Sequence, residues 1–216
     1  MSKRHTPLVT RNVFNPEKQV QRIVADKLAL EESKKRDLAN DWGINKTSLA
    51  GIEKKFNYPV KSWLMHQSKK RRRVISVLDL GCGEGTLGRD LRFFGGKKLR
   101  VVGSTVKKSK KNLYHNYDKI YEGDFSELQL KESFDCIISN CGGTFHTKQV
   151  TKMVSKVIDS LRVGGVAIVN FNRKEISIAE LVELLNQSGL KPNLNYRFSP
   201  NCNQLIIMKT KKHLPK

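Results

Sequence analysis

The chain has 216 residues, of which 38% are apolar, 28% charged and only 7% aromatic, and this suits one α/β domain with an aliphatic core and a short extension. Its longest apolar stretch, Val163–Val169, is too short to cross a bilayer, and no apolar signal core follows the basic residues 1–4. We therefore expect no membrane span, no secretory signal and a cytoplasmic protein.

Cysteine usage argues against a metal centre and against a disulfide framework. None of the four cysteines forms a Cys-x-x-Cys pair, the spacing typical of zinc sites. We expect reduced thiols and no metal site. The cysteines are Cys82, Cys136, Cys141 and Cys202.

The charge balance is strongly basic, with 41 Lys and Arg against 20 Asp and Glu and a net charge of +21. The excess is spread along the chain, and its sharpest cluster is Lys69–Arg73. Such a balance favours a nucleic acid or another anionic surface as partner, and a solvated lysine-rich surface explains it equally well. The cluster is compatible with a nuclear-import signal, an edge that contacts phosphate, or an exposed linker.

Residues 1–73 are expected to form a basic helical extension. After a loose tail over 1–14, Asn15-Pro16-Glu17 provides the N-cap, first-turn proline and acidic residue of a helix start, and Gly43 lies beyond the helix end. A later break falls at Asn57-Tyr58-Pro59, because proline pushes the residue before it out of helical geometry. The predicted helices cover residues 15–42, 48–56 and 60–67.

The most informative segment lies between residues 74 and 93. Residues 74–80 are mostly apolar, as in a strand buried on both faces, and a helix is predicted over 85–93. Between them, glycines at alternate positions let the backbone approach a ligand that a Cβ would exclude. Asp79 stands just before this turn, where a carboxylate can receive a ligand's ammonium group or hydroxyls. The glycines are Gly81, Gly83 and Gly85.

A dinucleotide site is the main alternative, because Gly83–Gly88 satisfies Gly-x-Gly-x-x-Gly. In a Rossmann dehydrogenase, however, the first glycine directly follows the strand. That place belongs to Gly81, and counting from it puts Thr86 where the third glycine should stand. The dinucleotide fingerprint also needs an acid about 20 residues on, whereas the next predicted strand leads into Ser104-Thr105.

After the turn, the chain alternates strand and helix. Alternation through five strands implies an α/β fold with a parallel sheet, helices on both faces and a ligand at the carboxyl ends of the strands. Residues 194–198 and 204–209 are predicted to close the sheet as an antiparallel pair. The predicted strands are 74–80, 99–103, 119–122, 134–140 and 166–171, and the predicted helices are 85–93, 107–115, 147–161 and 178–188.

Four segments in this order resemble the class I S-adenosylmethionine (SAM) dependent methyltransferases, of the type-11-like group. Asp79-x-Gly-x-Gly-x-Gly resembles their first motif, and Gly123-Asp124-Phe125 matches the segment that holds adenine. Residues 134–140 resemble their fourth strand, and Leu161–Gly165 resembles the turn before their fifth strand. Residues 41–42 and 56–59 faintly resemble their cap helices.

The resemblance implies a fold, a cofactor and a set of binding residues. The fold is a Rossmann-like doubly wound sheet, mostly parallel with a C-terminal antiparallel hairpin, over 74–210. Residues 1–73 would be the extension or cap and 211–216 a basic tail. The cofactor is SAM, and the residues implied to form its pocket are Asp79, Gly81, Cys82, Gly83, Gly85, Thr105, Asp124, Phe125 and Asn140.

Thr105 departs from the family, which usually places there an acid that grips both ribose hydroxyls. Because charged hydrogen bonds contribute about 1.5–3 kcal/mol and neutral ones about 0.5–1.5, SAM affinity could fall roughly tenfold. Glu84 or a cap residue could supply the missing contact instead. The alternative is a degenerate fold that binds SAM weakly.

The acceptor pocket is expected beside the segment 139–146. No Asn/Asp-Pro-Pro-Tyr/Phe motif follows residues 134–140, which argues against amino methylation of DNA or RNA bases. Cys141 lies near the place of the nucleophile in RNA 5-methylcytosine enzymes, but their accompanying proline is absent. His146, which many type-11-like members share, is the candidate general base, or else a structural histidine.

Two hypotheses follow. The first is a SAM-dependent methyltransferase (EC 2.1.1) whose acceptor is a small molecule, an RNA or a protein. The second, motivated by Thr105 and the charge of +21, is a basic nucleic-acid-binding or interaction module on a degenerate methyltransferase fold. A single RNA methyltransferase would satisfy both.

Overall fold

The computed structural model describes residues 48–210, apart from 107–113, 141, 148 and 200–202. All of the described residues lie within one compact unit. The predicted helix over 15–42, most of the one over 107–115, and the tails 1–14 and 211–216 lie outside them.

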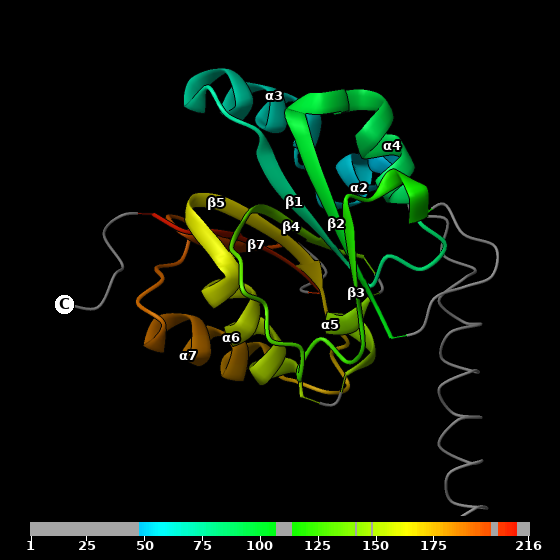
Figure 1. The fold of residues 1–216 in the computed structure, drawn as a ribbon. Helices are drawn as coiled ribbons and strands as arrows, with labels where there is room; N and C mark the ends of the chain where they lie inside the picture. The colour runs from blue at the N-terminus through cyan, green and yellow to red at the C-terminus, as the bar shows by residue number, and fades with distance from the viewer. Residues whose placement is uncertain (1–47, 107–113, 141, 148, 200–202, 211–216) are drawn as a thin grey trace, which may run out of the picture. The chain divides into compact units, whose positions relative to one another are not determined.

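The described strands form one sheet in the order β3-β2-β1-β4-β5-β7-β6 (Figure 1). The first five pair in parallel, and β7 runs antiparallel between β5 and β6. This confirms the predicted fold class. The strands are β1 Ile75–Leu80, β2 Leu99–Thr105, β3 Lys119–Glu122, β4 Phe134–Ser139, β5 Leu161–Asn170, β6 Tyr196–Phe198 and β7 Gln204–Met208.

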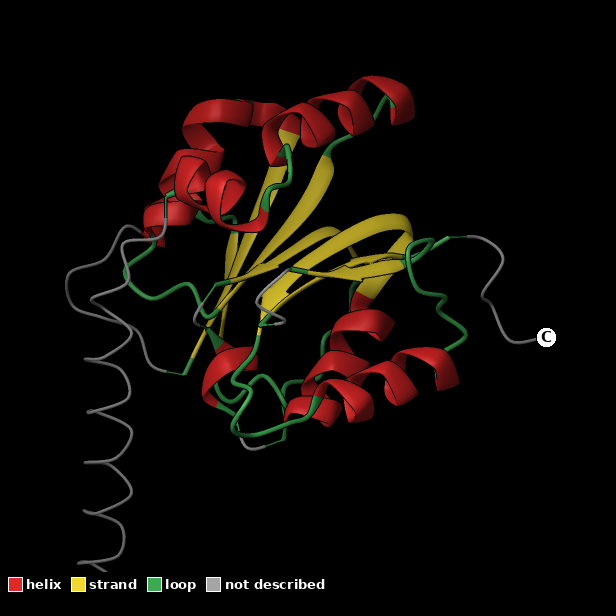
Figure 2. Cartoon of the chain, turned by 180° about the vertical axis from the view of Figure 1, so that it is seen from behind, coloured by secondary structure: helices red, strands yellow, loops and turns green. Residues whose placement is uncertain are grey.

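Helices cover both faces of the sheet (Figures 1 and 2). The α-helices are α2 Leu49–Phe56, α3 Val60–Arg71, α4 Thr86–Gly95, α5 Gly143–His146, α6 Val150–Ser160 and α7 Ile178–Gln187, and short 3-10 turns are η1 Gly96–Lys98 and η2 Tyr114–Asn116. The helices α2, α3 and α4 belong to one apolar cluster, and α6 and α7 belong to the other. The strands β1, β2, β4 and β5 contribute side chains to both clusters. Residues 48–71, which the sequence assigned to the extension, therefore pack on the sheet.

Local signals in the sequence explain the start and end of several helices. Ser48 caps α2 by accepting a hydrogen bond from the Gly51 amide at 3.0 Å, and Asn57 ends it with a left-handed φ of 45°. Ser177 and Glu180 form a capping box at the start of α7. These helices begin and end within a residue or two of the predicted positions.

The end of α3 differs from the prediction. The helix was expected to stop at Gln67, but it continues to Arg71 and ends at Arg72 with a φ of 49°. The reason is tertiary, because the Arg71 side chain reaches Asp135 in β4 with an N–O distance of 3.0 Å. The cluster Lys69–Arg73 is thus largely helical and is not an exposed linker.

The start of β5 also corrects the prediction. The strand begins at Leu161 and not at Val166, and its register with β4 shifts between Phe134 and Cys136. Gly164 has a φ of +74° and lets the chain bulge outward at this shift. The predicted Gly164-Gly165 turn is therefore an irregularity inside the strand. Likewise, the helix predicted over 147–161 is the shorter α6, preceded by α5.

Candidate functional site

The turn after β1 has the geometry that its glycines predicted. Gly81, Gly83 and Gly85 have φ values of +82°, +50° and +88°, a region that L-residues with a Cβ rarely adopt. The amides of Gly81 and Cys82 donate to the Ser104 carbonyl oxygen at 3.0 and 2.8 Å. The turn is thereby fixed to the carboxyl end of β2, and α4 begins directly after it.

The chain leaving β4 runs directly against this turn. A Cβ on Gly142 would lie 2.1 Å from the Leu80 carbonyl oxygen and 3.1 Å from the Gly81 Cα. No side chain fits there, so Gly142 brings the β4 exit to the glycine turn. The sequence named Gly142 only as part of the acceptor segment, because a contact between backbones distant in sequence leaves no local pattern.

Asp79 is buried at the carboxyl end of β1, with its side chain facing Tyr117. The Tyr117 hydroxyl donates to Asp79 Oδ2 at 2.6 Å and accepts from the Gly88 amide at 3.1 Å. Burial raises the pKa of Asp79 to about 7, although the bond from Tyr117 works in the opposite direction. This carboxyl therefore changes charge near neutral pH.

Two tyrosines that the sequence analysis did not single out support the turn. Tyr114 donates from its hydroxyl to the Gly83 carbonyl oxygen at 2.8 Å and packs edge-on against Tyr117. A Cβ on Gly88 or on Gly103 would meet the Tyr117 ring at 2.2 or 3.1 Å. The glycine in β2 and the one in α4 therefore make room for the ring that holds Asp79.

Cys82 is buried within the turn. Burial raises the pKa of its thiol well above the ordinary value, and the neighbouring Asp79 adds to the shift. The thiol stays protonated and does not act as a nucleophile. Its predicted role in the cofactor site stays a prediction.

The ends of β2 and β3 lie next to each other along the same edge. Thr105 is buried, and its carbonyl oxygen accepts from the Gly123 amide at 2.9 Å. Asp124 is exposed and accepts from the Ser126 amide at 2.8 Å, while Phe125 is buried. The strand order thus places Thr105 next to the glycine turn and Asp124 one strand farther along the same edge.

Asn140 follows β4 and contacts α2. Its side-chain oxygen accepts a hydrogen bond from the Lys55 ammonium group. Nearby, the buried Thr144 hydroxyl donates to the Asn170 carbonyl oxygen at 2.7 Å and fixes α5 to the end of β5. The backbone of His146 ends α5, but its side chain and all of Cys141 lie outside the described part, so their predicted roles stay predictions.

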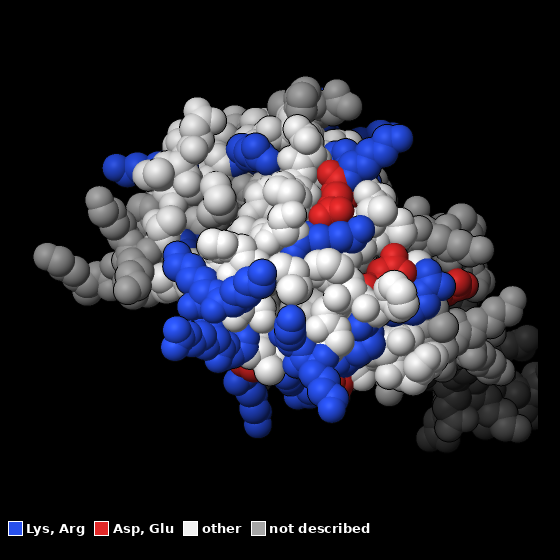
Figure 3. Space-filling model, turned by 90° about the horizontal axis from the view of Figure 1, so that it is seen from above, with Lys and Arg blue, Asp and Glu red and all other residues white. Residues whose placement is uncertain are grey.

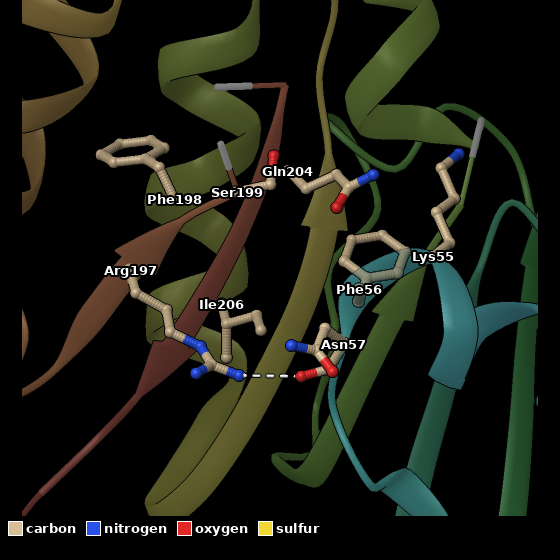
Figure 4. A pocket seen from close by; sticks show the side chains of 8 residues that line it. All are labelled: Lys55, Phe56, Asn57, Arg197, Phe198, Ser199, Gln204 and Ile206. Atoms are coloured by element: carbon tan, nitrogen blue, oxygen red, sulfur yellow. Dashed lines mark hydrogen bonds between the residues drawn. The ribbon is translucent and has the colours of Figure 1, made fainter. Parts of the chain in front are cut away.

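A hollow of about 140 Å³ lies between the end of α2 and the strands β6 and β7 (Figure 4). Arg197 crosses it and donates to the Asn57 carbonyl oxygen at 3.1 Å. The Ser199 hydroxyl oxygen is buried and has no hydrogen-bond partner among the described residues. Two cationic side chains and no carboxylate line the hollow, and Lys55 links it to Asn140. The lining residues are Lys55, Phe56, Asn57, Arg197, Phe198, Ser199, Gln204 and Ile206.

A family model described as a methyltransferase domain matches residues 77–165, from β1 into β5. Residues 77–165 therefore form a methyltransferase domain. The predicted family and its cofactor, SAM, are therefore confirmed, and the dinucleotide alternative for the glycine turn is set aside. No curated protein matches the chain.

Solved structures share the fold of this methyltransferase domain. A Methanococcus maripaludis protein provisionally described as a SAM-dependent methyltransferase is 18% identical, with a TM-score of 0.57, over 84% of this chain and 95% of that one. A TehB-like SAM-dependent methyltransferase from Corynebacterium glutamicum is 18% identical, with a TM-score of 0.50, over 69% of this chain and 87% of that one. At this identity, they show the fold alone.

Two kinds of feature are absent from the described residues. No group of three or more His, Cys, Asp and Glu side chains within 48–210 is arranged to hold a metal ion. Across the same described residues, none of the helices has the length and apolar character needed to span a bilayer.

Proposed function

We propose that the protein transfers the methyl group of SAM to an acceptor that binds beside the β4 exit. The observation that carries the proposal is the turn at Gly81, Gly83 and Gly85, which have positive φ values. Because glycine has no side chain, the backbone of this turn is uncovered at the carboxyl ends of β1 and β2. The backbone of Gly142 closes one side of the turn. Bare backbone at this edge fits a ligand held in close contact.

The residues along this edge fit the groups of SAM in order. Asp79 would receive the ammonium group, Thr105 the ribose hydroxyls, and Asp124 with Phe125 the adenine. SAM supplies a methyl carbon made electrophilic by the adjacent sulfonium. The protein's own contribution is to position the acceptor atom in line with that carbon.

The hollow beneath Lys55 is our candidate for the acceptor site. Lys55 and Asn140 join it to the cofactor edge, and Lys55 with Arg197 favours an acceptor that carries negative charge. Where the acceptor is a hydroxyl group, His146 would accept its proton, whereas a carboxylate is already ionised at neutral pH and needs no base. A small molecule, an RNA end or a protein side chain remains the acceptor class to be identified.

The second candidate function is a basic binding module that holds SAM weakly, and the neutral Thr105 favours it. The two functions differ in turnover. Incubation of the protein with methyl-labelled SAM and cell extract, followed by separation into RNA, protein and small molecules, should label one fraction. Calorimetric SAM binding with no label in any fraction would favour the binding module.

Gly81→Ala tests the cofactor site directly. We expect a loss of SAM affinity of tenfold or more by calorimetry, because a Cβ forces the turn out of its left-handed conformation. Gly96→Ala is the matched control, since Gly96 also has a positive φ of +51° but faces open space in η1. Both variants should lose similar stability, and equal SAM affinity in the two would contradict the proposal.

A further inference from the structure

A second hollow of about 420 Å³ lies at the opposite edge of the sheet, among arginines from three separate segments. Its lining comes from the amino ends of β1, β2 and β5. At about 3.3 Å per residue, the six residues of β1 separate this edge from the glycine turn by about 20 Å. The lining residues of this arginine hollow are Arg73, Val74, Ser76, Arg100 and Arg162.

Two carboxylates, one buried and one partly exposed, hold these arginines in fixed positions. Asp135 in β4 is fully buried, and it accepts from Arg73 at 2.8 and 2.5 Å and from Arg162 and Arg71 at 3.0 Å each. Arg100 binds Glu132 through both of its terminal nitrogens. Four guanidinium groups thus share two carboxylates.

The pairing leaves the hollow positively charged and open to a ligand. The side chains of Arg73, Arg100 and Arg162 each keep 37% of their surface exposed. The described bonds of Arg162 engage one of its five N–H donors and those of Arg73 engage three. Guanidinium groups that are already oriented match the oxygens of a phosphate without a further ordering cost.

Exposed cations continue from the hollow across the same edge. They come from the end of α3, from η1 and from the loop before β4. Figure 3 looks down on the edge where β1 and β2 begin, and it shows Lys and Arg in broad clusters with Asp and Glu at only a few points. The exposed members are Lys69, Lys70, Arg72, Lys97, Lys98 and Lys131.

We propose that this amino-edge basic surface binds the phosphodiester backbone of a nucleic acid, with one phosphate in the arginine hollow. Cations spread over several elements match a repeating polyanion better than a single small phosphate compound. A membrane surface would call for an apolar face as well. Among the described residues, the large exposed apolar side chains near these cations are single ones, Val74 in the hollow and Phe93 near the end of α4.

This binding is additional to methyl transfer and does not depend on it. The arginine hollow and the glycine turn lie at opposite edges of one sheet, so a nucleic acid on the first leaves the second accessible. Loss of nucleic-acid binding and loss of SAM binding can therefore be measured separately on the same protein.

The test is fluorescence anisotropy of the full chain with labelled RNA and DNA oligonucleotides at several salt concentrations. Lys69, Lys70 and Arg72 are replaced together by Gln, because they are exposed and can be changed without touching Asp135. For a single strand, loss of three phosphate contacts should flatten the slope of log K against log salt by about 2 and lower the affinity on the order of 100-fold at 0.1 M salt.

The matched control replaces Lys54, Arg173 and Lys174 by Gln, which removes the same charge from exposed positions away from the amino edge. It should keep most of the affinity, and thermal melting should show both triple variants folded. An equal loss of nucleic-acid affinity in the two variants would mean that binding depends only on the net charge of the protein, and it would overturn the proposal.

Two further arms also decide the proposal. Arg100→Gln should weaken nucleic-acid binding through the hollow itself, while Glu132 keeps the Tyr121 hydroxyl as a partner at 2.8 Å. Wild-type binding to phosphatidylserine vesicles in the absence of nucleic-acid binding, or full displacement of RNA by millimolar inorganic phosphate, would overturn it.

Discussion

Asp79 and Asp135 are buried aspartates of the neighbouring strands β1 and β4, and they lie at opposite edges of one sheet. Asp135 accepts hydrogen bonds from three arginines and from the Ser76 amide. Burial would raise its pKa, but the bonds from Arg73 and Ser76 hold the pKa below its usual value. Asp79 faces only the Tyr117 hydroxyl among its described partners, and its pKa rises to about 7.

The contrast separates a structural carboxylate from the one that we propose to bind the ammonium group of SAM. Full pairing makes Asp135 part of the folded framework. Weak pairing leaves Asp79 costly to ionise in the isolated protein, and an arriving ammonium group would relieve that cost. The same residue type thus serves stability at one edge and, in our proposal, recognition of SAM at the other.

Of the three substitutions, Asp135→Asn should have the largest effect, a loss of stability. The variant leaves three guanidinium groups around a neutral amide, and we expect a loss of about 3–5 kcal/mol in the free energy of unfolding, measured with urea. Because the folded pKa is depressed, the stabilisation is present above the unfolded pKa of about 4 and is lost as pH falls through the folded pKa. Glu132→Gln, at a partly exposed pair, should cost less, and a larger loss there would contradict the comparison.

Asp79→Asn should stabilise the protein, whereas Asp135→Asn should destabilise it. Between pH 4 and pH 7 the folded Asp79 binds a proton that the unfolded chain has released, so wild-type stability falls as pH rises through this window. The amide removes this penalty, and we expect a gain on the order of a few kcal/mol at pH 8 together with weaker SAM binding. Thermal melting at pH 5 and pH 8 measures it, and equal melting shifts at both values would count against the pKa assignment.

Thr105→Asp should have the smallest effect of the three, and the effect should be on SAM affinity. A carboxylate at the end of β2 gives ribose a charged partner, and we expect SAM affinity to rise about tenfold by calorimetry. Thr105→Asn is the control of similar shape without the charge and should change affinity little. An unchanged affinity for Thr105→Asp would show that another residue already holds the ribose.

Much of the fold could be predicted because its signals are local. The glycine turn, the cap at Ser48 and the break at Pro59 are each written within a few residues, and alternating strand and helix fixed the parallel sheet. The extension of α3 and the bulged start of β5 could not be predicted, since both depend on Arg71 and Gly164 meeting residues far away in the sequence.

The site was predictable to the same extent. Asp79 and the glycines carry a spacing that can be recognised, whereas Tyr117 and Gly142 act through space and show no pattern. The basic cluster Lys69–Arg73 stands out in the sequence by its charge. Its division into Arg71 and Arg73, which bind Asp135, and the exposed Lys69, Lys70 and Arg72 depends on contacts with β4 and has no local pattern. A cytoplasmic location, a nuclear-import role for this cluster and the base role of His146 stay predictions.

The position of β7 in the sheet has a consequence for biosynthesis. The strand β6 reaches the sheet only through β7, which pairs with β5 on its other side. During translation, residues 196–198 leave the ribosome first, yet they have no place in the sheet until residues 204–208 follow. The nascent domain therefore keeps the outer side of β5 uncovered until β7, the last of the described strands, emerges, and an open strand edge of this kind is prone to aggregation in that interval.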